Sequence, residues 1–177
     1  MSATVIRSFG PKDLLQLREI FFESSSRKTF ESESAREAFF HKYLGHYLGR
    51  YPDLARVALI NGEVMGYIVA SPETNQEDLF LLQPHLIMFK NYFAQFPAHL
   101  HINCHQDARG LGLGSLLINS TLNILAKGNI NGVHIMTSPE SKNTSFYRKL
   151  GFTFETVEEF HGSAILFMGR EISRNSF

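Results

Sequence analysis

The chain has 177 residues, the length of one ordinary domain, and we expect a single domain over residues 1–177. Hydrophobic residues make up 44% of the chain and charged residues 19%, and 17 basic residues balance 17 acidic ones. This composition argues against wholesale disorder, and the zero net charge provides no global attraction to nucleic acid or to an anionic membrane.

The first half of the chain predicts a strand, two helices and a hairpin. Pro11 suits the first turn of a helix, where its missing N–H costs nothing. Asn61-Gly62 tolerates the positive φ angles of a tight turn between two β-rich runs. In chain order the expected elements are a strand over Thr4–Phe9, a helix from Pro11, a helix over Ser32–Leu48, and strands over Leu54–Ile60 and Glu63–Ala70.

The second half predicts alternating strands and helices. After a helix that Pro84 opens and that runs through Phe93, the expected elements are a strand over Ala98–His105, a helix after the loop 106–115, a strand over Val133–Thr137, a short helix from residue 143 or 144 to Leu150, and strands over Phe152–Glu158 and Ser163–Met168. This mixed order predicts an α/β sandwich around a partly antiparallel sheet.

The cysteine content and the N-terminus predict the compartment. A single cysteine, Cys104, excludes an intrachain disulfide framework and a CxxC motif. No stretch approaches the roughly 18 apolar residues of a membrane span, and the N-terminus has no apolar signal core. We therefore expect a soluble cytoplasmic protein that binds no membrane.

A glycine-rich loop, Arg109-Gly-Leu-Gly-Leu-Gly114, separates an expected strand from an expected helix. Glycines let the backbone approach a ligand closely, and the first N–H groups of a helix lack internal partners, so this loop predicts a phosphate site. A P-loop would need a lysine before Ser115, and a dinucleotide-binding loop would need Gly-x-Gly-x-x-Gly spacing. Neither pattern is present. The alternative is a tight connection without a ligand.

These residues resemble the GCN5-related N-acetyltransferase (GNAT) family. Its acyl-CoA signature, Gln/Arg-x-x-Gly-x-Gly/Ala, is matched by Arg109, Gly112 and Gly114. A second family feature is matched by the segment Asn143–Phe152, which reads NTSFYRKLGF. The match is firm over residues 100–154, and the strand that follows Pro97 looks most like small bacterial acetyltransferases that resemble the acetyltransferase-like region of O-GlcNAcase.

The resemblance implies a GNAT-type α/β (α+β) fold, with a mixed, mostly antiparallel central sheet of about six to seven strands flanked by helices. It implies acetyl-CoA as co-substrate. Backbone groups at Cys104-His105 would pair with the pantetheine arm, and N–H groups from Arg109 to Ser115 would hold the pyrophosphate. The implied cofactor-binding set is Cys104, His105, Arg109, Gly110, Leu111, Gly112, Leu113, Gly114, Ser115, Asn143, Phe146 and Tyr147.

Acetyl transfer to an amine needs a proton donor for the departing thiolate and an acceptor for the amine proton. Tyr147 is the candidate general acid, and a core tyrosine is the alternative. His101, with an ordinary pKa near 6.5, is the candidate base, and His134 is the second choice. Asn103, on the same strand face as His101, cannot accept a proton. For each histidine a structural role is the alternative, and we expect no metal.

The leading hypothesis is therefore an enzyme that transfers acetyl from acetyl-CoA to a primary amine of a small molecule or a protein, acting as a monomer or homodimer without nucleic acid. The alternative is a catalytically degenerate GNAT module that binds acyl-CoA or a protein partner. We expect the acceptor to be selected by residues 20–50, 72–97 and the last hairpin. The aromatic residues of Ser32–Leu48 either pack in the core or line a substrate groove.

Overall fold

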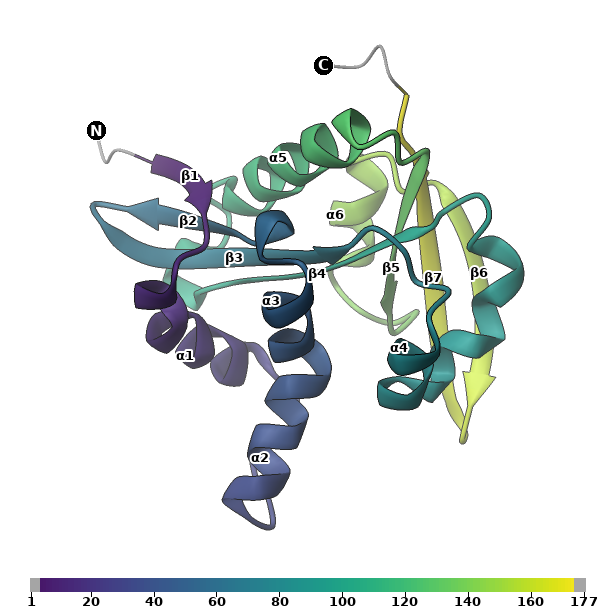
Figure 1. Cartoon of the computed structure of the whole chain (residues 1–177), viewed down its shortest axis with the longest axis horizontal. Coiled ribbons are helices and arrows are strands. Elements are labelled where there is room, and N and C mark those ends of the chain that lie inside the picture. The colour runs from purple at the N-terminus through teal and green to yellow at the C-terminus, as the bar shows by residue number, and fades with distance from the viewer. Residues whose placement is uncertain (1–3, 174–177) are drawn as a thin grey trace. The chain divides into compact units, whose positions relative to one another are not determined.

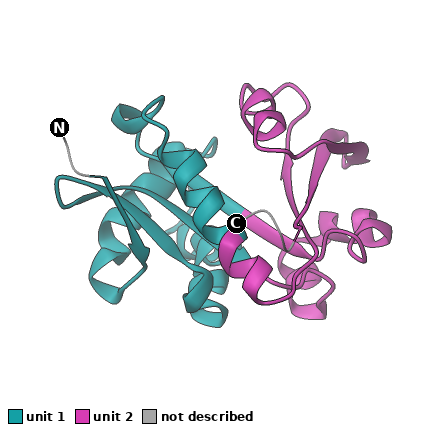
Figure 2. Ribbon diagram, turned by 90° about the horizontal axis from the view of Figure 1, so that it is seen from above, with its two compact units in different colours: residues 1–70, 101–122 teal, residues 71–100, 123–177 magenta. Residues whose placement is uncertain are grey.

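The structure is a computed structural model that describes residues 4–173. Its elements are labelled in Figure 1. The chain divides into two compact units, which Figure 2 colours separately: unit 1 is residues 1–70 and 101–122, and unit 2 is residues 71–100 and 123–177. The chain crosses between these units three times, so each unit is built from segments that are distant in sequence. A single domain over residues 1–177 stays a prediction.

Unit 1 contains the N-terminal strands and helices. Its elements are β1 (Thr4–Ser8), α1 (Leu14–Ser24), α2 (Glu33–Phe40), α3 (His46–Arg50), β2 (Arg56–Ile60) and β3 (Glu63–Ser71), followed by the end of β4 (Ala98–Cys104) and the start of α5 (Leu113–Lys127). The predicted hairpin is confirmed: β2 and β3 pair antiparallel, and Asn61 and Gly62 have φ angles of 53° and 90°.

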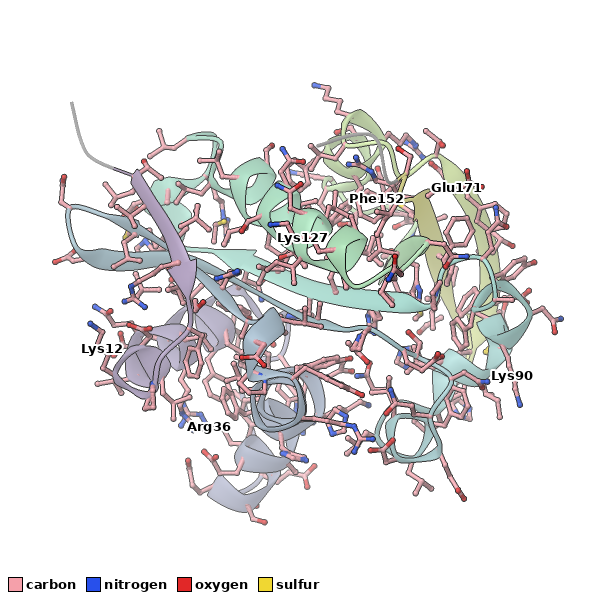
Figure 3. The ribbon with its side chains drawn as sticks, turned by 45° about the horizontal axis from the view of Figure 1, so that its top comes forward. Lys12, Arg36, Lys90, Lys127, Phe152 and Glu171 are labelled. Atoms are coloured by element: carbon pink, nitrogen blue, oxygen red, sulfur yellow. The ribbon has the colours of Figure 1, made fainter. Side chains whose placement is uncertain are left out.

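The predicted helix over Ser32–Leu48 is present but contains a π-helical turn, His41–Gly45, between α2 and α3. The hydroxyl of Ser32 caps α2 by accepting the N–H of Ala35 at 3.1 Å. Arg36, labelled in Figure 3, places its guanidinium carbon 4.0 Å from the centre of the Phe22 ring on α1. A π-helical turn shifts the side chains that follow it around the helix axis, and such turns are frequent at functional sites.

Unit 2 contains the C-terminal strands. Its elements are α4 (Glu77–Leu82), a 3₁₀ segment over Pro84–Tyr92, the start of β4, β5 (Gly132–Thr137), α6 (Thr144–Lys149), β6 (Phe154–Phe160) and β7 (Ser163–Glu171). The sequence did not predict helix α4. The helix that Pro84 was expected to open is present as a 3₁₀ helix, Pro84–Tyr92.

The strands form one seven-stranded sheet in the order β1-β2-β3-β4-β5-β7-β6. Strands β4 and β5 are parallel, with Ala98 beside Val133, whereas β1–β2, β2–β3, β5–β7 and β6–β7 are antiparallel. The predicted mixed α/β fold, with a mostly antiparallel sheet of six to seven strands flanked by helices, is confirmed.

Phenylalanines fill much of the core of unit 2. Phe89, Phe96, Phe152 (labelled in Figure 3) and Phe167 are at most 1% exposed. The rings of Phe89 and Phe167 stack with centres 5.3 Å apart. Burying such side chains removes about 150–250 Å² of surface each from water, so these rings supply a large share of the stability of unit 2.

An ion pair between Arg7 and the buried carboxylate of Asp13 connects β1 to the start of α1. Asp13 is 3% exposed and accepts two hydrogen bonds from Arg7, at 2.6 and 2.7 Å, and one from the N–H of Gly10 at 2.9 Å. Hydrogen bonding from Arg7 lowers the pKa of Asp13.

We expect Asp13→Asn to lower the free energy of unfolding by about 2 kcal/mol, because charge-assisted hydrogen bonds are lost at a buried position. Urea titrations of both proteins measure the difference. Glu155→Gln is the control, since Glu155 makes its bidentate pair with Arg148 at the surface, and it should cost clearly less. Equal losses of unfolding free energy in the two variants would contradict the stabilising role that we assign to the Arg7–Asp13 pair.

Candidate functional site

The glycine loop connects the end of β4 to the start of α5. A 3₁₀ turn over Gln106–Ala108 follows β4, and Gly110 and Gly112 then have φ angles of 79° and 80°. Only glycine adopts these angles without strain, so both glycines are required by the path of the backbone. Ala108 and Leu113 are each 1% exposed and anchor the loop to the core, while Gly110, Leu111 and Gly112 are exposed.

The backbone donors of this loop fall into two groups. The N–H groups of Arg109 and Leu111 donate to Gln106 and Ala108 within turns, at 3.2 and 3.4 Å. The N–H groups of Leu113, Gly114 and Ser115 belong to the first turn of α5, where a helix offers them no internal acceptor. Of the predicted pyrophosphate donors from Arg109 to Ser115, the N–H groups that remain available include those at the end of the loop next to α5. This end of the loop lies at the positive end of the dipole of a 15-residue helix.

The end of β4 approaches β3 closely. The backbone N–H of His105 donates to Met65 on β3 at 2.9 Å, so this predicted pantetheine donor is already used. A Cβ on Gly66 would lie 3.0 Å from Sγ of Cys104, which explains the glycine there. Burial raises the pKa of Cys104 to about 11, so its side chain is a thiol at neutral pH and a poor nucleophile.

His101, the predicted base, lies between two tyrosine rings. The rings of Tyr43 and Tyr67 both stack on it with centres 6.3 Å away. Burial lowers the pKa of His101 to about 4, well below the 6.5 expected for a strand histidine. The imidazole is therefore neutral at pH 7 and only a weak proton acceptor. Its role as base stays a prediction.

Tyr67 and Asn103 form a hydrogen bond next to His101. The Asn103 side chain donates to the Tyr67 hydroxyl at 2.7 Å, and Tyr67 is fully buried. Burial raises the pKa of Tyr67, so its hydroxyl keeps its proton. Asn103 is thus held as a donor, in agreement with the expectation that it accepts no proton.

His105 has acidic groups on both sides. Its Nε2 lies 3.4 Å from Oε2 of Glu23 at the end of α1, and its Nδ1 accepts the N–H of Asp107 at 3.3 Å. The carboxylate of Asp107 lies 3.6 Å from the same nitrogen. Both ring nitrogens therefore have partners, and the ring ties α1 to the start of the glycine loop.

A pocket of about 270 Å³ lies in unit 1, beside the end of β4. It is lined by Phe21, Ser24, Ser25, Ser26, Phe39, Tyr43, His101 and Asn103. Of these, the sequence singled out His101 and Asn103 as candidate site residues, and Phe39 and Tyr43 belong to the aromatic residues of Ser32–Leu48 for which a substrate groove was one of two interpretations. The aromatic residues between positions 39 and 43 were the sequence signal for this pocket, but aromatic content alone does not distinguish core packing from a substrate groove.

The second family feature lies in unit 2. Tyr147 is 7% exposed, and its ring packs at right angles to Phe152, with centres 5.7 Å apart, and against Phe146 at 5.2 Å. Asn143 is exposed at the start of α6, and its side-chain oxygen accepts the hydroxyl of Thr137 at 3.2 Å. The structure therefore gives each residue a local packing environment, and the roles of Asn143, Phe146 and Tyr147 toward acetyl-CoA stay predictions.

His134, the second choice for a base, is fully buried in unit 2. Its Nδ1–H donates to the carbonyl of Phe96 at 2.8 Å, and its ring stacks on Phe167 and His99. Burial lowers its pKa to about 3. These contacts describe a structural histidine, which was the alternative reading for it.

Residues 4–173 contain neither a candidate metal site nor a helix that could span a membrane. No group of three or more histidine, cysteine, aspartate or glutamate side chains there is placed to hold a metal ion. In the same range, no helix has the length and apolar character that crossing a membrane requires.

A mixed seven-stranded sheet, with a glycine loop that leads from β4 into α5, is the arrangement that the resemblance to acetyltransferases implies. A family model described as an acetyltransferase (GNAT) domain matches residues 52–154, more than half of the chain. The chain therefore belongs to the GNAT acetyltransferase family. Its finer placement beside the O-GlcNAcase-related proteins stays a prediction.

Solved structures share the fold at low sequence identity. The crystal structure of SsHAT matches with a TM-score of 0.78 and 21% identity, over 97% of this chain and 99% of that one. Ard1 from Thermoplasma volcanium matches at 0.67 and 19%, over 97% and 99%. A phosphinothricin acetyltransferase from Sinorhizobium meliloti, in complex with AcCoA, matches at 0.64 and 21%, over 98% and 90%. No curated protein matches the chain.

Proposed function

We propose that this protein transfers acetyl from acetyl-CoA to a primary amine. The observation that carries the proposal is the glycine loop at the start of α5, with Gly110 and Gly112 in conformations that favour glycine and an exposed backbone between them. Family membership supports the reaction, and the Sinorhizobium meliloti relative was solved with AcCoA.

The predicted acetyl-CoA-binding residues would contact different parts of the cofactor. The N–H groups of residues 112–115 would bind the pyrophosphate, because they combine an open backbone with the positive end of a helix dipole. The backbone of Cys104 would pair with the pantetheine arm, while His105 would contribute through its carbonyl or side chain because its N–H is already donated. Asn143 and Phe146 complete the set, with Tyr147 near the thioester.

The chemistry forms one C–N bond and breaks one C–S bond. The neutral amine attacks the thioester carbonyl, the amine nitrogen loses a proton, and the sulfur leaves and takes up a proton. Tyr147 would supply that proton as general acid. His101, neutral because its pKa is about 4, would accept a proton only from nitrogen already made acidic by its bond to the carbonyl carbon.

A catalytically degenerate module that binds acyl-CoA or a protein partner is the second candidate. One observation favours it, because none of three histidines is a ready proton acceptor: His101 and His134 have pKa values near 4 and 3, and both ring nitrogens of His105 have partners.

For the acetyltransferase, we also propose a cytoplasmic location and a monomeric or homodimeric state.

Calorimetric titration with acetyl-CoA tests the cofactor site, with NAD and ATP as control ligands. We expect acetyl-CoA alone to bind, and we expect Gly112→Glu to abolish binding, because the new carboxylate would stand where the pyrophosphate sits. Gly62→Glu is a matched control: Gly62 also has a φ near 90° and open space around its Cα, so it carries the same strain and charge.

Thermal unfolding of both variants shows whether each still folds. Equal loss of acetyl-CoA binding in the two folded variants would contradict the loop assignment. An absence of acetyl-CoA binding by the folded wild-type protein would contradict the proposed function.

A further inference from the structure

The pocket of unit 1 has a wall made of aromatic rings. Phe21 and Phe39 lie 5.6 Å apart between ring centres, Phe39 and Tyr43 lie 5.0 Å apart, and the His101 ring lies 6.2 Å from Phe21 and 6.3 Å from Tyr43. Four rings from α1, α2, the π-helical turn and β4 thus surround one cavity. Such an arrangement offers ring faces and edges to another flat ring.

Two polar atoms in this pocket have no partner among the described residues. Nδ1 of His101 and Oγ of Ser24 are both buried and make no hydrogen bond within the part of the chain that the structure describes. A buried polar atom without a partner costs free energy, so a bound molecule that satisfies either one is favoured. Both residues line the same pocket as the aromatic rings, so the occupant needs a polar group close to its apolar part.

The residues that line the pocket offer no carboxylate to a second ammonium group of a bound amine. No aspartate, glutamate, lysine or arginine lines it. Lys28 already bonds the carbonyl of Glu23 at the end of α1, with its Nζ at 2.6 Å. Arg27 places its guanidinium carbon 6.0 Å from the centre of the Phe39 ring. The second ammonium group of a diamine or polyamine would therefore find no carboxylate among the lining residues.

The size and place of the pocket point to a small acceptor. A volume of about 270 Å³ is just below the range of pockets for drug-sized ligands and suits one or two rings. Asn103 lines the pocket and lies one residue before Cys104, where the thioester arm would run. An amine attached to a ring in this pocket would therefore be near the reacting end of acetyl-CoA.

We propose that the acceptor is a small primary amine that carries an aromatic ring, that the ring binds among Phe21, Phe39 and Tyr43, and that diamines and polyamines are poor substrates. This assignment rests on the proposed function, because it names the substrate class of the same site.

Binding and turnover are measured with three amines: 2-phenylethylamine, 2-cyclohexylethylamine and putrescine. Saturation-transfer NMR reports binding without turnover, and release of CoA thiol reports turnover. We expect 2-phenylethylamine to bind about 3- to 10-fold more tightly than its cyclohexyl counterpart, which has the same carbon skeleton without the aromatic ring. Putrescine should bind more weakly than both.

The variants Phe39→Leu and Phe30→Leu test whether the aromatic ring of the amine binds in the pocket. Both residues are half-buried and their rings lie 5.3 Å apart, but only Phe39 lines the pocket. Phe39→Leu should weaken binding of 2-phenylethylamine about tenfold and leave acetyl-CoA affinity unchanged, while Phe30→Leu should change binding less than about twofold.

The outcomes separate the two proposals. Turnover of putrescine in preference to 2-phenylethylamine, or equal effects of the two variants, would overturn the aromatic assignment and leave acetyl transfer standing. Tight binding of 2-phenylethylamine that depends on Phe39, without any binding of acetyl-CoA, would support the pocket assignment and contradict the proposed function.

Discussion

Tyr147→Phe should lower kcat about 100-fold or more while the affinity for acetyl-CoA changes less than about twofold, because only the proton of the phenol is removed. The ring stays, so its packing against Phe146 and Phe152 is kept. Release of CoA thiol at saturating acetyl-CoA measures kcat, and calorimetry measures the affinity. This is the pattern of a group that acts in the transition state and not in binding.

Tyr92→Phe is the matched control for that experiment. Tyr92 is also in unit 2 and packs on Phe154 and Phe167, but it has no proposed catalytic role, so its kcat should stay within about twofold of wild type. Unchanged turnover in Tyr147→Phe would remove the tyrosine from the mechanism. A folded wild-type protein that binds acetyl-CoA but turns over no amine would favour the degenerate module.

Short-range patterns predicted the parts of this fold that depend on local backbone chemistry. Asn61-Gly62 predicted a tight turn because few other pairs tolerate two positive φ angles, and the structure has them. Gly110 and Gly112 were singled out because glycine lets the backbone approach a ligand closely, and both have φ near 80°. The mixed sheet followed from the order of strands and helices along the chain.

Features set by long-range contacts were not available from the sequence. Helix α4 is six residues long, too short to show a helical period, and the 3₁₀ type of the helix that Pro84 opens was not specified. The pKa of His101 depends on burial beside Tyr43 and Tyr67, which are 58 and 34 positions away in sequence. The pocket combines α1, α2 and β4, so its lining required the fold.

His101 and His134 should make the protein unstable in mild acid. Burial lowers the pKa of His101 to about 4 and that of His134 to about 3, whereas both have a pKa near 6.5 when unfolded. The unfolded chain therefore binds more protons below pH 6.5, so the stability is fully present above that pH and is lost as the pH falls toward the folded pKa values. Each histidine contributes a slope of about 1.4 kcal/mol per pH unit, roughly 2.7 together.

Urea titrations between pH 7.5 and 4.5 measure this slope, and the part of the range above about pH 5 excludes the contribution of Asp13, whose lowered pKa adds to the loss of stability below it. His134→Phe should halve the slope even if it lowers stability at pH 7.5, because the ring is kept and the titration is removed. His41→Phe, at an exposed position, should leave the slope unchanged. A wild-type stability that stays flat from pH 6.5 to 4.5 would mean that these imidazoles find proton-stabilising partners in the folded protein. In that case His101 would be a stronger base than its burial implies, and its place in the proposed mechanism would gain support.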